Sequence, residues 1–366
     1  MDFAPSDEQR AVADLANRIL TDLCAPEVLR EVESGTEWFH RELWDALAAA
    51  DLLGLCLPES VGGGGYGFVE ACLLLQEAGR AVAPVPLWST LTAALAVAEL
   101  GTDEQRAQVL PAVADGSSIL TVAFDELDAP PRAPQVAARR DGDGWRLDGA
   151  KTNVPAVHLA STVLVPARAE DGAVVLLLVP ADAARLTAAR QDTFNHEPHF
   201  RLDLDGVRVG ADAELPGGQA ALERLVDLAT VGVCALASGV ADGGMTRTAA
   251  YVTERKQFDR PIGSFQAVGH RMADCYVDNE AIRLTMLQAA TRLAVGEPAD
   301  REVAVAKYWA AYGGRRVGHA DLHLHGGISI DLDYPIHRYF LWAKQLELTL
   351  GAASPQLARL GASLAG

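Results

Sequence analysis

The chain has 366 residues, 49% of them hydrophobic and 22% charged, which is enough for two or three packed units with sizeable cores. Its 31 basic and 49 acidic residues give a net charge of −18, which argues against non-specific binding to nucleic acid or to an anionic membrane. The five cysteines lack metal-ligand spacing and indicate a reducing compartment. The acidic N-terminus lacks a signal-peptide pattern, and the longest uncharged stretch, near 228–241, is short for a membrane span, so we expect a cytoplasmic protein.

Residues 1–117 are predicted to be helical. Ser6 precedes acidic residues and an apolar helical spacing, which indicates the start of the first helix. The four glycines Gly62–Gly65 lack the lysine and hydroxyl spacing of a phosphate loop, so we interpret them as a connecting turn. Further helices are expected at Trp38–Ala50, Val69–Arg80 and Leu87–Leu100.

Residues 118–214 change to short β-type runs separated by Asp-Gly turns, which predicts a small antiparallel barrel or sandwich. From residue 217 onward, long helical patterns return. We therefore expect a mainly α protein with three domains at 1–117, 118–214 and 215–366. The predicted strands are Ile119–Phe124, Val136–Arg139, Trp145–Leu147, Thr162–Pro166, Val174–Val179 and Phe200–Val209, and the predicted later helices are 217–256, 264–294, 298–324 and 336–349.

Between Tyr251 and Cys275 the chain reads YVTERKQFDRPIGSFQAVGHRMADC. A proline and a glycine interrupt the helical pattern, and Ser264 is expected to cap the helix that follows. The string resembles the acyl-CoA dehydrogenase signature R-x-x-F-G-x-P-I-x-x-F-Q, with Asp259 in place of the usual Gly. The resemblance extends over almost the whole chain. It implies an α-helical domain, a small central β-barrel domain and a C-terminal four-helix bundle.

The resemblance also implies the reaction. This family oxidises an acyl-CoA thioester to its α,β-enoyl form, and a Glu opposite the flavin removes the α-proton. Two places in the family supply that Glu, and here they hold Leu350 and Ala229, neither of which can accept a proton. The resemblance therefore implies no catalytic residue in this chain. A relocated base, Glu347 or Asp227, remains an alternative.

The flavin-facing strings of the family are changed as well. The string A-x-T-E-P-x-A-G-S-D corresponds to AFDELDAPPR, which keeps Glu126 but lacks the hydroxyls. The string G-x-K-x-x-I-T-N corresponds to GAKTNVPA, which keeps Lys151. Proline has no N–H to donate, so the face that would hold the isoalloxazine ring is predicted to be eroded. The replacing residues are Asp125, Pro130, Pro131, Arg132, Val154, Pro155 and Ala156.

The other half of a flavin site is retained. In the family, the ADP end of each FAD is held by the neighbouring subunit, through the signature Arg and a Q-x-x-G-G turn. Arg255 would contact the pyrophosphate, and the paired glycines would let the backbone approach it. His323 and His325 have no carboxylate or Cys nearby in sequence, so no metal site is expected. The cofactor-binding residues that the resemblance implies are Arg255, Phe258, Gln266, His323 (in place of Gln), Gly326 and Gly327.

This pattern resembles the non-catalytic subunit of the heterotetrameric, α2β2 acyl-CoA dehydrogenases of actinobacterial steroid side-chain degradation. The resemblance implies a homologous partner that carries the catalytic Glu, FAD shared with that partner, and an acyl-CoA substrate. Three alternatives remain open: an active homotetramer with a displaced base, a flavin monooxygenase-like protein of the same fold, and a scaffold without cofactor.

Overall fold

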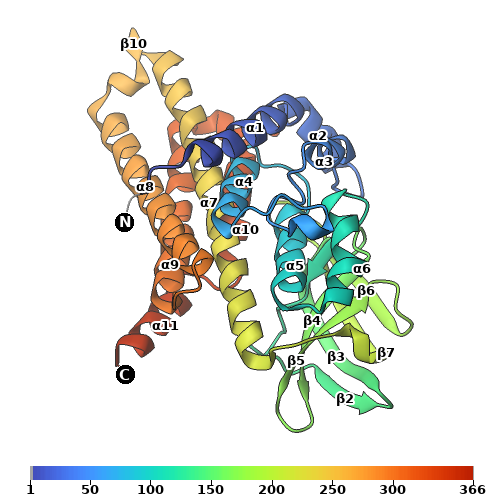
Figure 1. Cartoon of the computed structure of the whole chain (residues 1–366). Helices are drawn as coiled ribbons and strands as arrows, with labels where there is room; N and C mark the ends of the chain where they lie inside the picture. The colour runs from blue at the N-terminus through green and yellow to red at the C-terminus, as the bar shows by residue number, and fades with distance from the viewer. Residues whose placement is uncertain (1–2, 366) are drawn as a thin grey trace. The chain divides into compact units, whose positions relative to one another are not determined.

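The computed structural model describes residues 3–365 and divides the chain into two compact units. Helix α7, Gly218–Glu254, contributes residues to both of them (Figure 1). Each unit is made of stretches that are separated in the sequence by stretches of the other unit. The three-domain division at 117 and 214 stays a prediction. The helical unit is Met1–Arg30, Phe68–Ala83 and Thr230–Gly366, and the sheet unit is Glu31–Gly67 and Pro84–Ala229.

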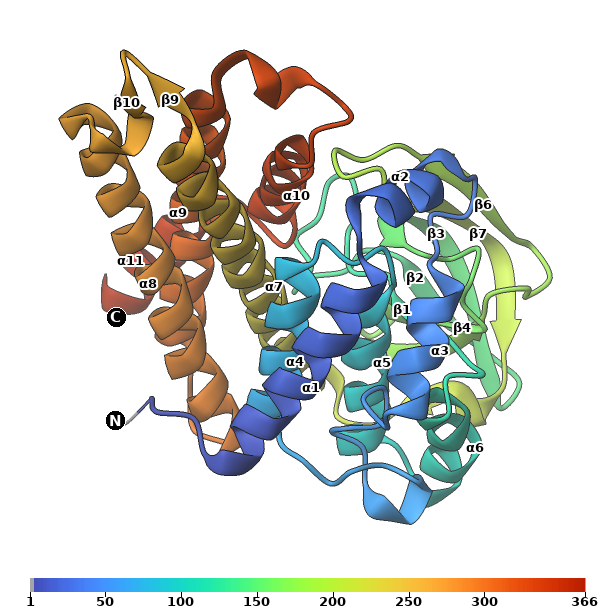
Figure 2. The same cartoon turned by 90° about the horizontal axis from the view of Figure 1, so that it is seen from above.

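The helical unit is a bundle in which α8, α10 and α11 pack against α9 (Figure 2). Ser6 caps the first helix as predicted, because its hydroxyl accepts a hydrogen bond from the Gln9 N–H and the Gln9 side chain accepts one from the Ser6 N–H. Helix α11 was not predicted. Besides α7, the helices are α1 Asp7–Leu23, α4 Phe68–Arg80, α8 Gln266–Ala294, α9 Asp300–His325, α10 Ile336–Leu348 and α11 Ala353–Ala365.

Helices α4 and α7 approach each other through glycines. A Cβ on Gly239 would collide with the Gln76 carbonyl oxygen and lie 2.6 Å from the Arg80 nitrogen. A Cβ on Gly79 would collide with the Leu236 carbonyl oxygen. The two backbones are therefore closer than any side chain allows, and glycine is required on both sides of the contact.

The segment between α7 and α8, residues 255–265, forms a protruding turn that we call the elbow. Strands β9, Lys256–Gln257, and β10, Arg260–Pro261, pair in antiparallel fashion around Phe258 and Asp259. Phe258 and Asp259 have φ of 52° and 63°, the left-handed region in which Gly is most comfortable and Asp is tolerated. This geometry explains why the signature has Gly where the chain has Asp259.

The predicted N-cap of α8 is wrong. The Ser264 hydroxyl donates to the Pro261 carbonyl at 2.7 Å within the elbow. Helix α8 instead begins after Phe265, whose side chain makes no capping bond. The hydroxyl is therefore used by the turn, which competes with the helix for it.

The sheet unit packs helices α3, α5 and α6 with a β-sheet. All six predicted β runs are strands, and two further strands of the sheet, β6 and β8, were missed. The side chains of β6 are mostly exposed and the strand is defined by its pairing with β7, and β8 has only two residues, which pair with β5. The helices are α3 Arg41–Ala49, α5 Leu87–Leu100 and α6 Asp103–Ala114, with α2 Pro26–Ser34 at the boundary of the units. The strands are β1 Leu120–Val122, β2 Ala137–Asp141, β3 Gly144–Pro155, β4 Thr162–Ala169, β5 Val174–Pro180, β6 Leu186–Gln191, β7 His199–Val209 and β8 Glu214–Leu215.

The sheet is mixed rather than purely antiparallel. Its strand order is β6-β7-β3-β2-β4-β5-β8, and both β1 and β2 pair with β4 in parallel. Within residues 3–365 no pairing joins the outer strands β6 and β8, so the predicted closed barrel is not confirmed. Buried side chains from β2 to β7, including Trp145, Leu147 and Leu177, form the core against one face of this sheet.

Helix α7 is long and apolar enough to cross a bilayer, judged by length and composition alone. Most of its apolar stretch is buried inside the protein. Val231, Val233 and Leu225 are each at most 1% exposed. Burial in the protein therefore accounts for this composition without a membrane.

Replacement of Gly239 by Ala should destabilise the helical unit by about 1–3 kcal/mol or more, because the α4 backbone must move to admit the methyl group. The Gly361→Ala variant is the matched control, since Gly361 lies in α11 with open space around it and should gain up to about 1 kcal/mol. Urea unfolding of both variants measures the effect. Equal stability of the two variants would contradict the close approach of α4 and α7.

Candidate functional site

The elbow presents Arg255 to solvent. Its backbone is fixed at both ends, because its N–H donates to the Tyr251 carbonyl at 2.8 Å and its carbonyl accepts the Ile262 N–H at 2.8 Å. The side chain is exposed and makes no ion pair with any described residue of this chain. The backbone of Arg255 is therefore fixed, and its guanidinium is available for an anion.

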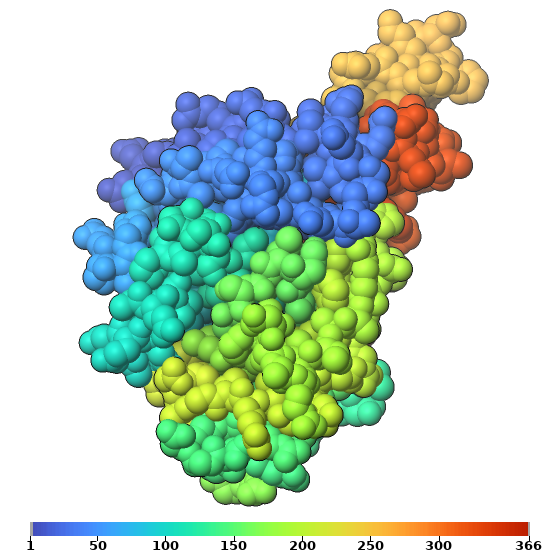
Figure 3. Space-filling view, turned by 90° about the vertical axis from the view of Figure 1, so that its right-hand side faces the viewer, coloured from blue at the N-terminus to red at the C-terminus, as the bar shows by residue number. Residues whose placement is uncertain are grey.

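The other predicted elbow residues surround this position. Phe258 is 87% exposed and packs edge-on against Phe265 at 6.2 Å, and the Arg260 guanidinium lies 4.1 Å from the Phe265 ring centre. Gln266, the first residue of α8, lies 3.4 Å from His270 through their Nε2 atoms. In Figure 3 the elbow projects beyond the rest of the helical unit, so its aromatic and basic side chains are accessible.

The glycine turn follows directly on α9. Gly326 has φ of 65°, and no atom lies within 4 Å of a Cβ built on Gly326 or Gly327. Both glycines and His323 are exposed. A flat, side-chain-free stretch of backbone of this kind lets a phosphate or ribose come close.

Packing brings the elbow and the glycine turn to the same end of the helical unit. Tyr251, one helical turn before Arg255, stacks on His325 at 4.4 Å between ring centres. His325 directly precedes Gly326. The sequence-predicted residues that follow α7 and α9 are thus brought to the same end of the unit, although about 70 residues separate Arg255 from Gly326 in the chain. Tyr251 and His325 were not predicted as residues that bring the elbow and the glycine turn together. Only their helical spacing to Arg255 and Asp321 could have indicated this role.

Neither base position carries an ionisable group. Ala229 is fully buried, and its carbonyl accepts the Trp88 indole N–H at 2.9 Å. Leu350 lies between α10 and α11 with φ of 55°, and its carbonyl accepts a bond from the Gln356 amide at 3.2 Å. The carbonyls of both residues accept structural hydrogen bonds, and neither aliphatic side chain can accept a proton.

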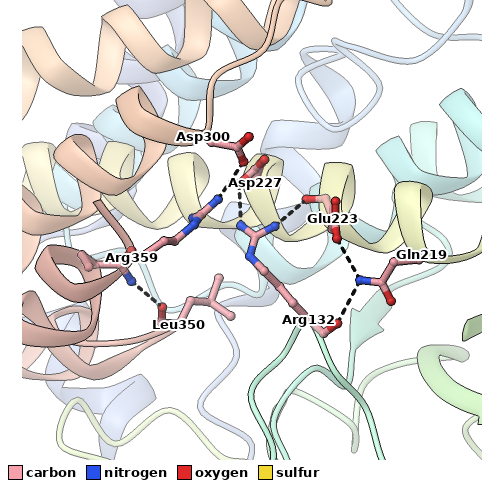
Figure 4. A network of polar contacts seen from close by, with 8 residues as sticks. Arg132, Gln219, Glu223, Asp227, Asp300, Leu350 and Arg359 are labelled. Carbon is pink, nitrogen blue, oxygen red and sulfur yellow. Dashed lines mark hydrogen bonds and ion pairs between the residues drawn. The ribbon is translucent and has the colours of Figure 1, made fainter. Parts of the chain in front are cut away.

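The two candidate relocated bases are held in ion pairs within their own units. Glu347 pairs with Lys344 at 3.1 Å. Asp227 pairs with Arg132, whose guanidinium also donates to the Glu223 carbonyl at 3.2 Å (Figure 4). Each carboxylate would have to leave a cation of its own chain before it could take a substrate proton.

Lys307 holds the end of α10 beside Glu347. Its ammonium is fully buried and donates to the carbonyls of Leu346 at 2.9 Å and Glu347 at 3.1 Å. Burial lowers the pKa of Lys307 to about 8. This lysine satisfies helix-terminal carbonyls and has no access to solvent, so its role is structural.

In the flavin-facing strings, the two surviving family residues bind each other. Lys151 and Glu126 form a pair at 2.7 Å with side chains 0% and 8% exposed, and Glu126 also accepts the Gln135 N–H at 2.9 Å. Burial lowers the pKa of Lys151, and the Glu126 carboxylate opposes that shift. Burial likewise raises the pKa of Asp125, which stands in place of the family Thr. These groups stabilise the sheet unit rather than present donors to a ligand.

Of the three loop residues that replace the Gly-Ser-Asp of the family, Arg132 is held on α7. Beyond the Arg132–Asp227 pair, the Gln219 amide donates to the Arg132 carbonyl at 3.0 Å and to Glu223 at 3.0 Å (Figure 4). Pro130 and Pro131 precede this contact and have no N–H. The residues present on this face do not fit an isoalloxazine ring, whereas the exposed arginine and glycine turn fit the phosphate end of a dinucleotide.

Among the described residues, no cluster of three His, Cys, Asp or Glu side chains is arranged to hold a metal ion. The imidazole of His325 is buried and its Nδ1 lies 2.8 Å from the Asp321 carbonyl, whereas His323 is exposed. The two histidines that the sequence places close together therefore have different surroundings.

Comparison with known proteins identifies the class. The Acyl-CoA dehydrogenase N-terminal domain family matches residues 6–117, and the C-terminal domain family matches residues 217–365. Acyl-CoA dehydrogenase FadE27 of Mycobacterium tuberculosis is 41% identical over 100% of this chain and 99% of its own length. The chain belongs to the acyl-CoA dehydrogenase family, whose members are flavin-dependent oxidoreductases.

Two solved complexes are similar in structure. The ChsE4-ChsE5 complex from Mycobacterium tuberculosis contains a chain with a TM-score of 0.95 and 40% identity, covering 100% of this chain and 99% of that one. A variant of the Tcur3481-Tcur3483 steroid ACAD gives a TM-score of 0.93 and 47% identity, covering 98% of each chain. Each of these complexes is named for two different proteins, in agreement with the expected homologous partner.

Replacement of Glu126 by Gln should destabilise the sheet unit by about 3–5 kcal/mol at pH 7, because the buried Lys151 then loses its hydrogen-bonded counter-charge and keeps only the more weakly acting Asp125. The loss should shrink as pH rises, since a neutral amine needs no partner. Urea unfolding at pH 7 and pH 9 measures both effects. Asp203→Asn in the exposed Arg201–Asp203 pair of the same sheet is the control and should change little.

Proposed function

We propose that this chain is the non-catalytic subunit of a heteromeric, FAD-dependent acyl-CoA dehydrogenase. Its partner is a homologous chain that supplies the catalytic Glu and the flavin-facing sheet. This chain supplies the ADP end of the partner's FAD site, through Arg255 and the Gly326-Gly327 turn. The assembly is an α2β2 tetramer in the cytoplasm.

One contrast supports this proposal above the others. In the sheet unit, the ionisable groups next to the family's flavin strings are paired with each other, as in Lys151–Glu126 and Arg132–Asp227. In the helical unit, Arg255 has no carboxylate partner among the described residues, and the glycine turn is open. A homotetramer needs both halves of the site in one chain, and a scaffold needs neither.

The residues present define what this chain does in the reaction. When bound, FAD would supply the acceptor for the β-hydrogen of the acyl group. Arg255 would neutralise pyrophosphate charge and so hold the ADP end of the cofactor. The backbone of Gly326 and Gly327 leaves room for close approach, and Phe258 offers an apolar ring beside the adenine end. Proton abstraction is left to the partner, since Leu350 and Ala229 have no acceptor.

The substrate we propose is a bulky acyl-CoA of the steroid side-chain class. The support is the similarity to the Tcur3481-Tcur3483 steroid ACAD, at 47% identity over 98% of each chain. Turnover by the purified complex with steroid-CoA and short-chain acyl-CoA thioesters tests this class.

The isolated chain should show no acyl-CoA dehydrogenation with any chain length of substrate, because both base positions are aliphatic. The measurement is reduction of an artificial electron acceptor by the purified chain, with the partner complex as positive control. Turnover that Glu347→Gln or Asp227→Asn abolishes would instead establish a relocated base.

Replacement of Arg255 by Ala should weaken FAD binding by the complex about 10–150-fold, because one charge-assisted hydrogen bond to phosphate is lost. The two chains should still assemble. Fluorescence titration of FAD into the deflavinated complex measures the affinity. Arg260→Ala, which removes a neighbouring elbow cation that stacks on Phe265, is the matched control for general loss of charge. Unchanged affinity of the Arg255 variant would exclude a pyrophosphate contact.

The complex should hold about two FAD per four chains. One kind of interface joins the partner's flavin face to Arg255 here, whereas the other would place the isoalloxazine against Pro130, Pro131 and the closed Lys151–Glu126 pair. Unpaired buried acceptors on the ring cost about 1–3 kcal/mol each, so the second kind of site stays empty. Flavin absorbance against protein mass gives the ratio, and four tightly bound flavins would contradict the division of roles.

A further inference from the structure

We propose that two contacts between α7 and α9, Thr248 with Asp321 and Tyr251 with His325, are positioning elements that set Arg255 in register with the Gly326-Gly327 turn. We call these two contacts the rungs. The inference rests on the proposed function for the identity of the ligand, but the rungs themselves are contacts within the helical unit. It gives a role to side chains that the sequence analysis did not select.

The spacing along both helices fits this role. On α7, Thr248 and Tyr251 are three residues apart and so lie along one face. Arg255 is the first residue after the helix, and its N–H donates to the Tyr251 carbonyl at 2.8 Å. On α9, Asp321 and His325 are four residues apart, and Gly326 follows. Each rung joins a residue of α7 to a residue of α9. Beyond the second rung, the chain continues to Arg255 after α7 and to the Gly326-Gly327 turn after α9.

The first rung is buried and short. Thr248 Oγ1 lies 2.8 Å from Asp321 Oδ1 and 2.9 Å from the Gly244 carbonyl oxygen, and the two residues are 0% and 1% exposed. A threonine hydroxyl has one hydrogen, so it cannot donate to both oxygens. If Asp321 is protonated, it donates to Thr248 Oγ1 and the hydroxyl donates to Gly244, and both distances are then hydrogen bonds. Burial raises the pKa of Asp321 to about 7, in agreement with this proton count.

The second rung fixes the imidazole that precedes the turn. His325 Nδ1 donates to the Asp321 carbonyl at 2.8 Å, and the Tyr251 hydroxyl donates to the His325 carbonyl at 3.4 Å. The Tyr251 ring stacks on the imidazole of His325 at 4.4 Å between ring centres, with 25° between the planes. The Tyr334 ring also packs against this imidazole, with 5.3 Å between ring centres. The residue immediately before Gly326 is thus held through both its side chain and its backbone.

The surroundings of Asp321 leave little to stabilise its charged form. On α8 the thiol of Cys275 faces it, and burial raises the pKa of that thiol to about 12. Farther along α8 lie Arg271, Asp274 and Asp278, which interact with Cys275. From α10, Tyr339 packs against Gly244, and its hydroxyl accepts a bond from Arg247 of α7 at 2.8 Å. His325 on α9 meets the Asp321 backbone and not its carboxyl group.

The sign of the pH effect follows from the direction of this shift. A carboxyl group whose pKa is raised by folding contributes most to stability when it is protonated, and it loses that contribution as pH rises from its unfolded value toward its folded one. The contribution of the first rung therefore falls between about pH 4 and about pH 7. Above about pH 7 the Asp321 carboxyl group is ionised, the rung has lost its second hydrogen, and the ends of α7 and α9 are held less firmly.

Hydrogen exchange of the full-length chain tests the rungs without any ligand. Thr248→Val should lower the protection factors of amides in the elbow and in residues 326–330 about 10-fold, the size expected for one lost hydrogen bond. Thr253→Val on the same helix is the matched control, because the Thr253 hydroxyl is exposed and donates to Ala249 of its own helix. Equal protection in the two variants would overturn the positioning role.

The pH profile separates the rung from general packing. Protection of the turn, corrected for intrinsic exchange, should fall between about pH 4 and about pH 7 in the wild-type chain and change little above that range. Asp321→Asn keeps a donor for Thr248 and cannot ionise, so its protection should stay at the low-pH level throughout. Asp321→Leu has no donor and should be unprotected at both ends of the range. Parallel profiles for the wild type and Asp321→Asn would overturn the proton count.

FAD titration of the complex at pH 6 and pH 8 distinguishes this inference from the proposed function. Arg255→Ala and Thr248→Val should both weaken binding, and the pH dependence should disappear in Asp321→Asn. If Arg255→Ala weakens binding and Thr248→Val does not, the ADP pocket stands and the positioning role is wrong. If exchange responds as expected and neither variant changes FAD affinity, the rungs stand and the assignment of the pocket to FAD is wrong.

Discussion

Helix α7 imposes the main constraint on this structure, because one continuous helix carries residues that must each meet a different environment. Gly239 must face the α4 backbone, where no side chain fits, and this fixes the rotation of the helix. With 3.6 residues per turn, that rotation also fixes where Thr248 and Tyr251 point, and Arg255 follows directly after the helix. The contact with α9 and the place of the exposed arginine are therefore consequences of a single packing arrangement within the helical unit.

Charge pairing divides the chain's ionisable groups into two kinds. The ionisable groups beside the family's flavin-facing strings form ion pairs with other residues of this chain. Buried pairs such as Lys151–Glu126 are costly to open once formed. Arg255 is in the opposite situation, since it is exposed on a chain whose net charge is −18. A local group of cations is needed to attract an anion to such a protein, and the elbow supplies Arg255, Lys256 and Arg260.

Backbone conformation restricts the same region. Phe258 and Asp259 both have positive φ, which brings the chain back tightly enough for β9 and β10 to pair. Gly326 also has positive φ and ends α9 at the point where the stacked His325 holds it. The elbow and the turn are thus shaped by backbone geometry first, and their side chains are presented from a fixed frame.

The amino-acid sequence by itself determined the order of helices and strands, since helical and alternating apolar patterns are local properties, and the family motifs determined which residues stand at the base and cofactor positions. It missed β6, which is a strand only because β7 pairs with it, and it placed the cap of α8 on Ser264, whose hydroxyl the elbow takes. The tertiary structure alone decided that Glu347 and Asp227 are held by cations, that Lys151 and Glu126 bind each other, and that Tyr251 meets His325. These are contacts between residues far apart in the chain, or rotations of one side chain toward another, and no local pattern encodes them because they arise only when whole helices pack.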